Sequence, residues 1–186
     1  MVVGLDFSEA ARVASERCRD LPNVHILQAD LSRPPFASGI FDFVWSEGVI
    51  HHTPETAESL AKLSSLVRPG GKIYVWIYSS VVTSPYRLAR RVLRKSYLLP
   101  PAILYGLAWS LAVALHGMNK IRELLRLSKF RHRLASTACS FYDALSPEFM
   151  HCHSQSEVSG WFTRQGFEQV NFFSDTADIA VCGTKR

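Results

Sequence analysis

The chain has 186 residues, 47% of them hydrophobic and 20% charged, a balance that predicts a globular domain with a real core and excludes an intrinsically disordered chain. The net charge of +5 is unevenly placed, because Tyr86–Arg133 holds eleven Lys or Arg residues and one acid, Glu123. The sequence therefore predicts an acidic domain with a basic insertion. The four cysteines show no CxxC spacing and no secretory leader is evident, so we expect reduced thiols and a cytoplasmic location, with membrane-peripheral attachment as an option.

The first 80 residues alternate short apolar runs with helical patterns. We predict strands over Val2–Asp6, Val24–Gln28, Phe41–Trp45 and Lys72–Tyr78, and helices from about Glu9 to Arg19 and from Pro54 to Val67. Arg68–Gly71 is expected to be a turn between helix and strand, without a catalytic role. Strands that alternate with helices form a parallel sheet with helices on both faces, so the predicted class is α/β.

A helical insertion is predicted over residues 81–135. Tyr86–Tyr97 and Lys120–Phe130 have amphipathic patterns with basic sides, and the apolar helix Ala102–Leu115 lies between them. Those 14 residues are fewer than the roughly 20 that a membrane-spanning helix needs. We therefore expect a lid over an acceptor pocket. Peripheral contact of residues 86–133 with an anionic membrane is the second interpretation, and nucleic-acid binding is the weakest because no nucleic-acid-binding fold is recognisable.

The last part of the chain returns to the α/β pattern. We predict a helix from about Ser156 to Gln165, ended by Gly166, and strands over Phe167–Phe173 and Asp178–Gly183. Two consecutive strands imply an antiparallel edge on the sheet.

Asp6 ends the first predicted strand, at the edge where open α/β sheets bind ligands. A carboxylate in that position accepts hydrogen bonds from the two ribose hydroxyls of a nucleotide, while a glycine-rich turn after the preceding strand admits the rest. The sequence has the carboxylate and lacks the glycine-rich turn. We therefore expect it to begin at the second strand of such a fold.

Four segments carry a resemblance to a known family: Val2–Ser8 (VVGLDFS), Gln28–Leu31 (QADL), Phe41–Pro54 (FDFVWSEGVIHHTP) and Leu66–Lys72 (LVRPGGK). In this order they resemble a class I S-adenosylmethionine-dependent methyltransferase of the small-molecule type. The closing residues are similar to the family's last helix and strand pair. The resemblance implies a Rossmann-like domain over residues 1–80 and 136–186, N-terminally truncated, with residues 81–135 inserted.

The resemblance implies S-adenosylmethionine as cofactor and three groups of binding residues. The ribose group is Asp6, Phe7 and Ser8, the adenine group is Ala29, Asp30 and Leu31, and the methionine group is Ser46, Glu47 and Gly48. Two simpler interpretations stay open, because Asp6 could be an acid at a helix N-terminus and Asp30 a solvated loop acid.

His51 and His52 are candidates for a general base facing the acceptor, since an unperturbed histidine titrates near neutrality. A packed structural histidine is an equal alternative, and in-line methyl transfer needs little beyond alignment of the reactants. The spacing of His151, Cys152 and His153 fits no common zinc pattern, so no metal is expected.

Two classes of function follow. The first is methyl transfer from S-adenosylmethionine to a small or lipid-linked acceptor, impaired where the glycine-rich loop is missing. The second is a non-catalytic remnant or a membrane-peripheral binding module. In the family's topology the missing strand would lie between Val2–Asp6 and Phe41–Trp45, and its loss would leave both without a ladder partner. Three outcomes stay open: the chain is an incomplete gene product, the two strands pair directly, or a partner supplies the strand.

Overall fold

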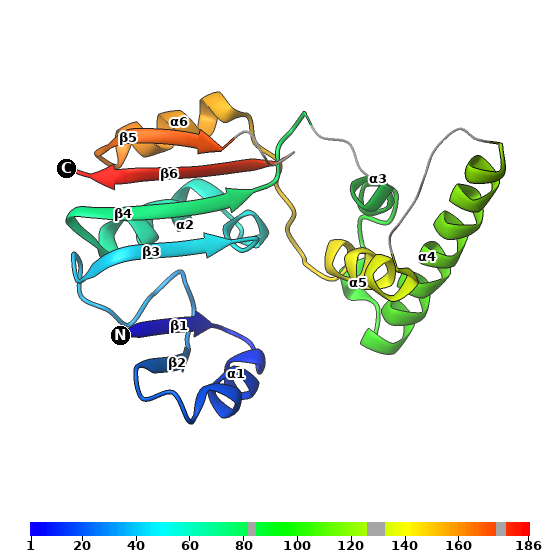
Figure 1. Cartoon of the computed structure of the whole chain (residues 1–186), viewed down its shortest axis with the longest axis horizontal. Helices are drawn as coiled ribbons and strands as arrows, with labels where there is room; N and C mark the ends of the chain where they lie inside the picture. Colours follow the sequence, from blue (N-terminus) through cyan, green and yellow to red (C-terminus); the bar gives the residue numbers. More distant parts are fainter. Residues whose placement is uncertain (82–84, 126–132, 174–177) are drawn as a thin grey trace. The chain divides into compact units, whose positions relative to one another are not determined.

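The computed structural model describes residues 1–81, 85–125, 133–173 and 178–186, which divide into two compact units (Figure 1). Unit 1 contains Met1–Ser80 and His151–Arg186, and unit 2 contains Val81–Met150. Each unit has a hydrophobic cluster of its own.

The described residues of unit 1 form six strands, three α-helices and one 3-10 turn. In chain order these are β1 (Val2–Asp6), α1 (Ala10–Cys18), β2 (Val24–Gln28), β3 (Phe41–Glu47), η1 (Ile50–His52), α2 (Thr56–Leu66), β4 (Val67–Ile77), α6 (Gln155–Arg164), β5 (Phe167–Phe173) and β6 (Ile179–Lys185). Ser154 caps α6 in a capping box with Glu157, which fixes where that helix begins.

The strands of unit 1 form two sheets. β1 pairs with β2 in parallel, from Val2 opposite Val24 to Asp6 opposite Gln28. The second sheet has the order β3-β4-β6-β5, in which β3 and β4 are parallel and β6 is antiparallel to both of its neighbours. The predicted α/β class, the parallel strands and the antiparallel edge are confirmed, and β6 rather than β5 lies next to β4.

The core of unit 1 lies on one face of the four-stranded sheet. Ile73, Val75 and Ile77 alternate along β4 toward this face and are at most 1% exposed. Both α2 and α6 cover it, as Figure 1 shows. Phe43 and Trp45 on β3 belong to the other face of this sheet and are exposed, because side chains alternate between the two faces of a strand.

No ladder joins β1 to β3 among the described residues, although each is the outer strand of its sheet. Direct pairing of these two strands, one of the three outcomes considered for them, is therefore wrong. β1 also has no fully buried residue, in contrast to the buried β4. The backbone N–H and C=O groups along the outer side of β1 and β3 are those that a further strand would satisfy.

Arg68–Gly71 lies within β4 and not in a separate turn, which corrects the expectation for this segment. The register with β3 shifts from Phe41 opposite Val67 to Phe43 opposite Lys72, so the four residues bulge from the ladder. Gly70 has a φ of 74°. A Cβ on Gly71 would lie 2.9 Å from the Asp42 carbonyl oxygen and 3.0 Å from that of Arg68.

We expect Gly71→Ala to lower the free energy of unfolding by about 1–3 kcal/mol, because two backbone oxygens would have to move to admit a methyl group. Urea denaturation of the chain measures the change. Gly160→Ala is the matched control, since Gly160 lies in α6 and its nearest neighbour would be the end of a flexible arginine, Arg164, at 3.4 Å. The control should gain up to about 1 kcal/mol from helix propensity. Equal effects of the two substitutions would contradict the prediction.

Unit 2 contains helices and no strand among its described residues. They are α3 (Pro85–Val92), the 3-10 turn η2 (Ser96–Leu98), α4 (Pro101–Leu124) and α5 (Leu134–Leu145). Pro101 is the first residue of α4, where its missing N–H costs no helical hydrogen bond. α5 was not predicted, and the end of the predicted helix Lys120–Phe130 lies outside the described residues.

α4 runs without a break from the apolar helix predicted over Ala102–Leu115 into the one predicted from Lys120, and Gly117 lies between them within α4. A glycine inside a helix costs only about 1 kcal/mol, which packing against α5 readily offsets. The argument that the apolar helix is too short to span a membrane is therefore wrong. α4 has 24 residues, and its length and composition alone would allow it to cross a membrane.

Candidate cofactor and acceptor site

Asp6 is the last residue of β1, and its side chain faces the start of α1. Its Oδ1 accepts hydrogen bonds from the Ser8 backbone N–H at 2.8 Å and the Ser8 hydroxyl at 2.7 Å. The Ser8 hydroxyl oxygen in turn accepts from the Ala10 N–H at 3.2 Å. Phe7 between them is 79% exposed. The carboxylate thus stabilises the start of the helix, and both bonds use a single one of its oxygens.

Ala29, Asp30 and Leu31 follow β2 at the same end of the two-stranded sheet. The Ala29 N–H donates to the Asp6 carbonyl at 3.0 Å, which ties the two strand ends together. Asp30 Oδ1 accepts from the Ser32 N–H at 2.8 Å. That hydrogen bond lowers the pKa of Asp30, so its carboxylate is ionised at neutral pH. Leu31 packs against the core of unit 1.

Ser46, Glu47 and Gly48 lie at the carboxyl end of β3. Ser46 is 6% exposed and Glu47 is exposed as the last residue of the strand. Gly48 has a φ of 72° and donates its N–H to the Trp76 carbonyl at 3.1 Å. A Cβ here would have its nearest neighbour at 3.9 Å, so it is the left-handed backbone rather than crowding that favours glycine.

His51 and His52 form η1, directly after this segment. His51 is 0% exposed, and its ring centroid lies 4.1 Å from those of both His52 and Tyr78. The His151 N–H donates to the His51 carbonyl at 2.9 Å. His52 is only partly buried. Of the two candidates, His52 is therefore the one that a small molecule can reach, whereas His51 is packed inside unit 1.

His153 belongs to the same part of unit 1, a placement that the sequence pattern did not predict. It forms a β-bridge with Ser79, and its Nε2 lies 3.0 Å from the Thr56 hydroxyl. Its side chain is 13% exposed, and burial lowers its pKa although Glu157 acts in the opposite direction. Among the described residues no group of three metal-ligating side chains is found. The role of His153 was not evident from the sequence, because its partner Thr56 lies nearly 100 positions away.

We expect His153 to make stability pH-dependent. Its folded pKa is depressed below the unfolded value of about 6.5, so its stabilising contribution is present above that pH and is lost as the pH falls through the folded pKa. His153→Gln keeps a polar group near Thr56 and removes the titration. Urea midpoints at several pH values between 7.5 and 5 test this, and the variant should lose less stability than the parent across the range.

Thr56→Val is the matched variant, because it removes the hydroxyl partner and keeps the buried imidazole. It should cost about 0.5–1.5 kcal/mol at neutral pH and retain the pH dependence. A His153→Gln protein with the same pH dependence as the parent would rule out this role.

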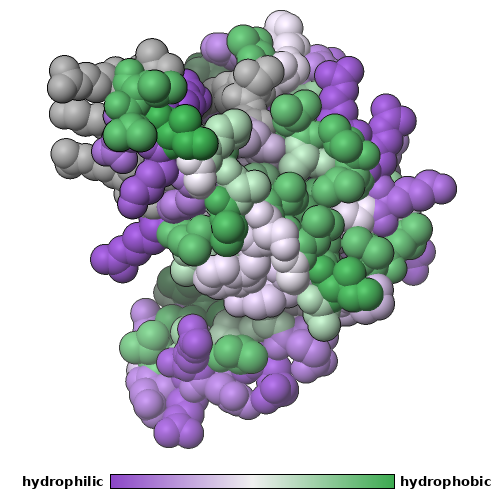
Figure 2. Space-filling view, turned by 90° about the vertical axis from the view of Figure 1, so that its right-hand side faces the viewer, coloured by the Kyte–Doolittle hydropathy of each residue, from purple (hydrophilic) through white to green (hydrophobic). Residues whose placement is uncertain are grey.

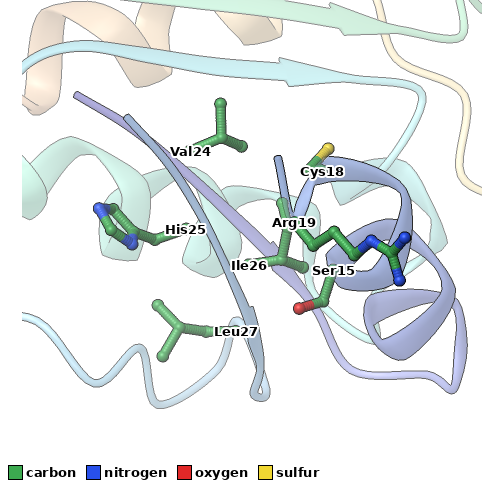
Figure 3. A pocket seen from close by; sticks show the side chains of 7 residues that line it. All are labelled: Ser15, Cys18, Arg19, Val24, His25, Ile26 and Leu27. Carbon is green, nitrogen blue, oxygen red and sulfur yellow. The ribbon is translucent and has the colours of Figure 1, made fainter. Parts of the chain in front are cut away.

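A cavity of ≈ 400 Å³ lies between α1 and β2 (Figure 3). It is lined by Ser15, Cys18, Arg19, Val24, His25, Ile26 and Leu27. In Figure 3 His25 and Leu27 point away from Ile26, as alternation along a strand requires. None of the predicted cofactor residues lines this cavity, so the candidate site is the set of strand ends.

Residues 1–75 match a family described as "Methyltransferase domain". A demethylmenaquinone methyltransferase of Staphylococcus haemolyticus is 32% identical over 85 residues, which is 45% of this chain and 35% of that protein. A 2-phytyl-1,4-naphtoquinone methyltransferase of Thermosynechococcus vestitus is 29% identical over 108 residues, or 58% of this chain and 48% of that protein. This chain thus matches at most about half the length of these relatives.

A solved structure of an S-adenosylmethionine-dependent methyltransferase from Thermotoga maritima has a similar fold. The TM-score is 0.54 at 16% sequence identity, and the alignment covers 100% of this chain and 73% of that chain. At this identity the likeness concerns the fold alone.

Proposed function

We propose that this chain transfers a methyl group to a small, apolar acceptor. The premise is that, by its resemblance in sequence and in fold, it is a class I S-adenosylmethionine-dependent methyltransferase. One observation carries the proposal. Asp6 ends β1, Asp30 lies just after β2 and Gly48 just after β3, so in each of the two sheets of unit 1 these residues lie at the carboxyl ends of parallel strands, where open α/β sheets bind ligands.

The chemistry of these residues fits the nucleoside part of the cofactor. Oδ1 of Asp6 accepts the two hydrogen bonds from Ser8, and the carboxylate has further acceptor positions that two neighbouring ribose hydroxyls can use. Asp30 would accept from the adenine amino group, and the Leu31 N–H would meet the ring. When bound, S-adenosylmethionine supplies an electrophilic methyl group on a sulfonium centre.

The residues after β3 would hold the other end of the cofactor and the acceptor. In this proposal the end of β3, Ser46 and Glu47, and the following Gly48 lie along the methionine part, and Gly48 keeps side-chain bulk away from it. His52 would receive a proton from an acidic acceptor atom, and an acceptor without such a proton would need only alignment. His51 holds η1 in place through its packing against Tyr78.

The acceptor class is inferred from the relatives. Two of them are named for quinone substrates, one of which carries a phytyl chain. An apolar ring system suits the aromatic side chains near η1, where Trp76 and Tyr78 lie with ring centroids 5.5 Å apart. Whether unit 2 acts as a lid over this acceptor stays a prediction.

The second candidate function is a binding module that does not transfer methyl groups. It is favoured by one observation, that no ladder joins β1 to β3 in the part of the chain that the structure describes.

Calorimetric titration of S-adenosylmethionine into the 186-residue chain separates the two candidates. We expect saturable binding of one equivalent, followed by transfer of radiolabelled methyl to a demethylated naphthoquinone. A longer protein, with an added strand and glycine-rich turn before Met1, is measured in parallel. Binding by the longer protein alone would refute the proposal for the chain as it stands, and binding by neither would refute it altogether.

A further inference from the structure

One side of α4 is exposed and free of charge over most of its length. Seven residues at spacings of three and four form this side, which we call the α4 outer stripe: Ile103, Gly106, Ser110, Val113, Gly117, Ile121 and Leu124. The four large ones are 56–83% exposed. No Asp, Glu, Lys or Arg occurs between Pro101 and Asn119. Figure 2 shows hydrophobic side chains gathered over this face.

The opposite side of α4 is already used inside unit 2. Ala108 and Ala112 are 0% exposed and pack with Ala138 and Phe141 of α5. His116 Nε2 lies 3.0 Å from the Thr137 hydroxyl, which fixes the two helices in rotation as well as in distance. The outer stripe is therefore not a core surface of unit 2, and an exposed apolar surface of this extent marks an interaction site.

The polar atom of the outer stripe is also satisfied within the helix. The Ser110 hydroxyl donates to the Gly106 carbonyl at 2.9 Å. Ser110 can therefore leave water without losing a hydrogen bond, because its donor is already used. The stripe thus has no polar group whose desolvation would oppose burial in an apolar environment.

The charges next to the stripe determine what covers it. Lys120 and Arg122 stand on either side of Ile121, and Glu123 precedes Leu124. Arg91, Arg94 and Lys95 are exposed at the end of α3 and just beyond it, and α3 packs against α5, so these three add to the positive charge of unit 2 without bordering the stripe. Arg90 is not one of this set, because it is buried and donates to the Glu148 carbonyl at 2.7 Å. A second copy of this chain would bring like charges together, whereas an anionic surface would neutralise them.

We propose that the α4 outer stripe inserts into the interface of an anionic membrane, with α4 parallel to the surface and the exposed cations against lipid phosphates. At 1.5 Å per residue α4 is ~36 Å long, enough to cross a bilayer. Crossing would carry α5 with it, and the exposed Asp143 of α5 would enter hydrocarbon. An in-plane helix buries the stripe and leaves Asp143 in water.

Sedimentation with vesicles tests the proposal on the whole chain at low salt. The probes are vesicles of phosphatidylcholine alone and of phosphatidylcholine with about 30% phosphatidylglycerol, a content at which each basic residue near the surface contributes measurably. We expect the protein to pellet with the anionic vesicles and to stay largely in the supernatant with the neutral ones. Protein left in the supernatant with both would overturn the proposal.

Two variants distinguish insertion from simple charge attraction. Val113→Glu places a charge in the stripe and should weaken partitioning at least about tenfold. Its matched control is Val13→Glu, which changes a 40% exposed valine of α1 in unit 1 and should leave partitioning unchanged. Lys120→Gln combined with Arg122→Gln, the two cations beside Ile121, should weaken binding about 20- to 30-fold, at roughly fivefold for each charge.

Circular dichroism of each variant shows that it is folded, and light scattering without vesicles measures its oligomeric state. Equal partitioning of Val113→Glu and the parent would overturn the assignment of the stripe. A dimer that Val113→Glu dissociates, in a protein that does not bind vesicles, would overturn it too, since the stripe would then be covered by a second copy.

Discussion

Replacing Phe162 with alanine is expected to lower the free energy of unfolding of unit 1 by about 3–5 kcal/mol. Phe162 of α6 is 0% exposed, and its ring centroid is 5.4 Å from that of Phe167. Its ring also lies over Gly183 of β6, where a Cβ would come within 2.9 Å of it. The substitution removes the ring from between α6 and the sheet and leaves a cavity that its surroundings fill only in part.

Tryptophan fluorescence during urea denaturation reports on this change. Three of the four tryptophans, Trp45, Trp76 and Trp161, belong to unit 1, so the signal is dominated by the unit that contains the substitution. Phe173→Ala is the matched control, since Phe173 lies on the same sheet and is 45% exposed. It should cost only about 0.5 kcal/mol. A Phe162→Ala loss as small as that of the control would show that α6 does not close the core.

The second large effect concerns the cofactor. Asp6→Asn should weaken the binding of S-adenosylmethionine about 10- to 100-fold, because hydrogen bonds to a charged acceptor contribute about 1.5–3 kcal/mol. An asparagine oxygen can still accept from Ser8, so the start of α1 should be preserved. Calorimetric titration gives the affinity, and circular dichroism checks the helix content.

Asp20→Asn is the control for the loss of a negative charge. Asp20 is 89% exposed at the end of α1, with Arg19 at 3.7 Å as its ion-pair partner. We expect its affinity for S-adenosylmethionine to equal that of the parent. If Asp6→Asn also binds with parental affinity, Asp6 is only the helix-stabilising acid that the alternative interpretation describes.

Most of the α/β part could be predicted because its signals are local. The bounds of β2 and β5 agree with the sequence pattern to the residue, since short apolar runs between turn residues are read directly as strands. The bulge at Arg68–Gly71 could not be predicted. Its glycines are equally typical of a turn, and only pairing with β3 keeps the segment in the sheet.

The helical unit was harder to predict, for a physical reason. Gly117 was read as a boundary, yet α4 continues through it because α5 supports the helix from one side. α5 itself has serines, a threonine and a cysteine in its sequence, which resemble a loop until Ala138 and Phe141 are seen against α4. Tertiary packing decides both cases, and packing partners far apart in sequence leave no local pattern.

The candidate site was predictable in its strand-end residues and not in its surroundings. Asp6, Asp30 and Gly48 lie at or just after the carboxyl ends of strands that the sequence identifies. The burial of His51 and the contact of His153 with Thr56 depend on how residues 151–153 return to β4 and α2, which no local pattern encodes.

The sparse burial of β1, β2 and α1 affects how firmly the nucleoside residues are held. Ala11 is the one buried hydrophobic residue among residues 1–49. The other buried hydrophobic residues of the described chain lie at Ile50 or beyond it. Segments with few buried contacts open at a lower free energy, so the backbone amides of β1 and β2 exchange with solvent before those of β4 and β6. A ligand bound by Asp6 and Asp30 would slow that exchange, by about 2.7 kcal/mol of opening free energy at a hundredfold excess over Kd. The concentration of cofactor would then set how long this part of the chain stays closed.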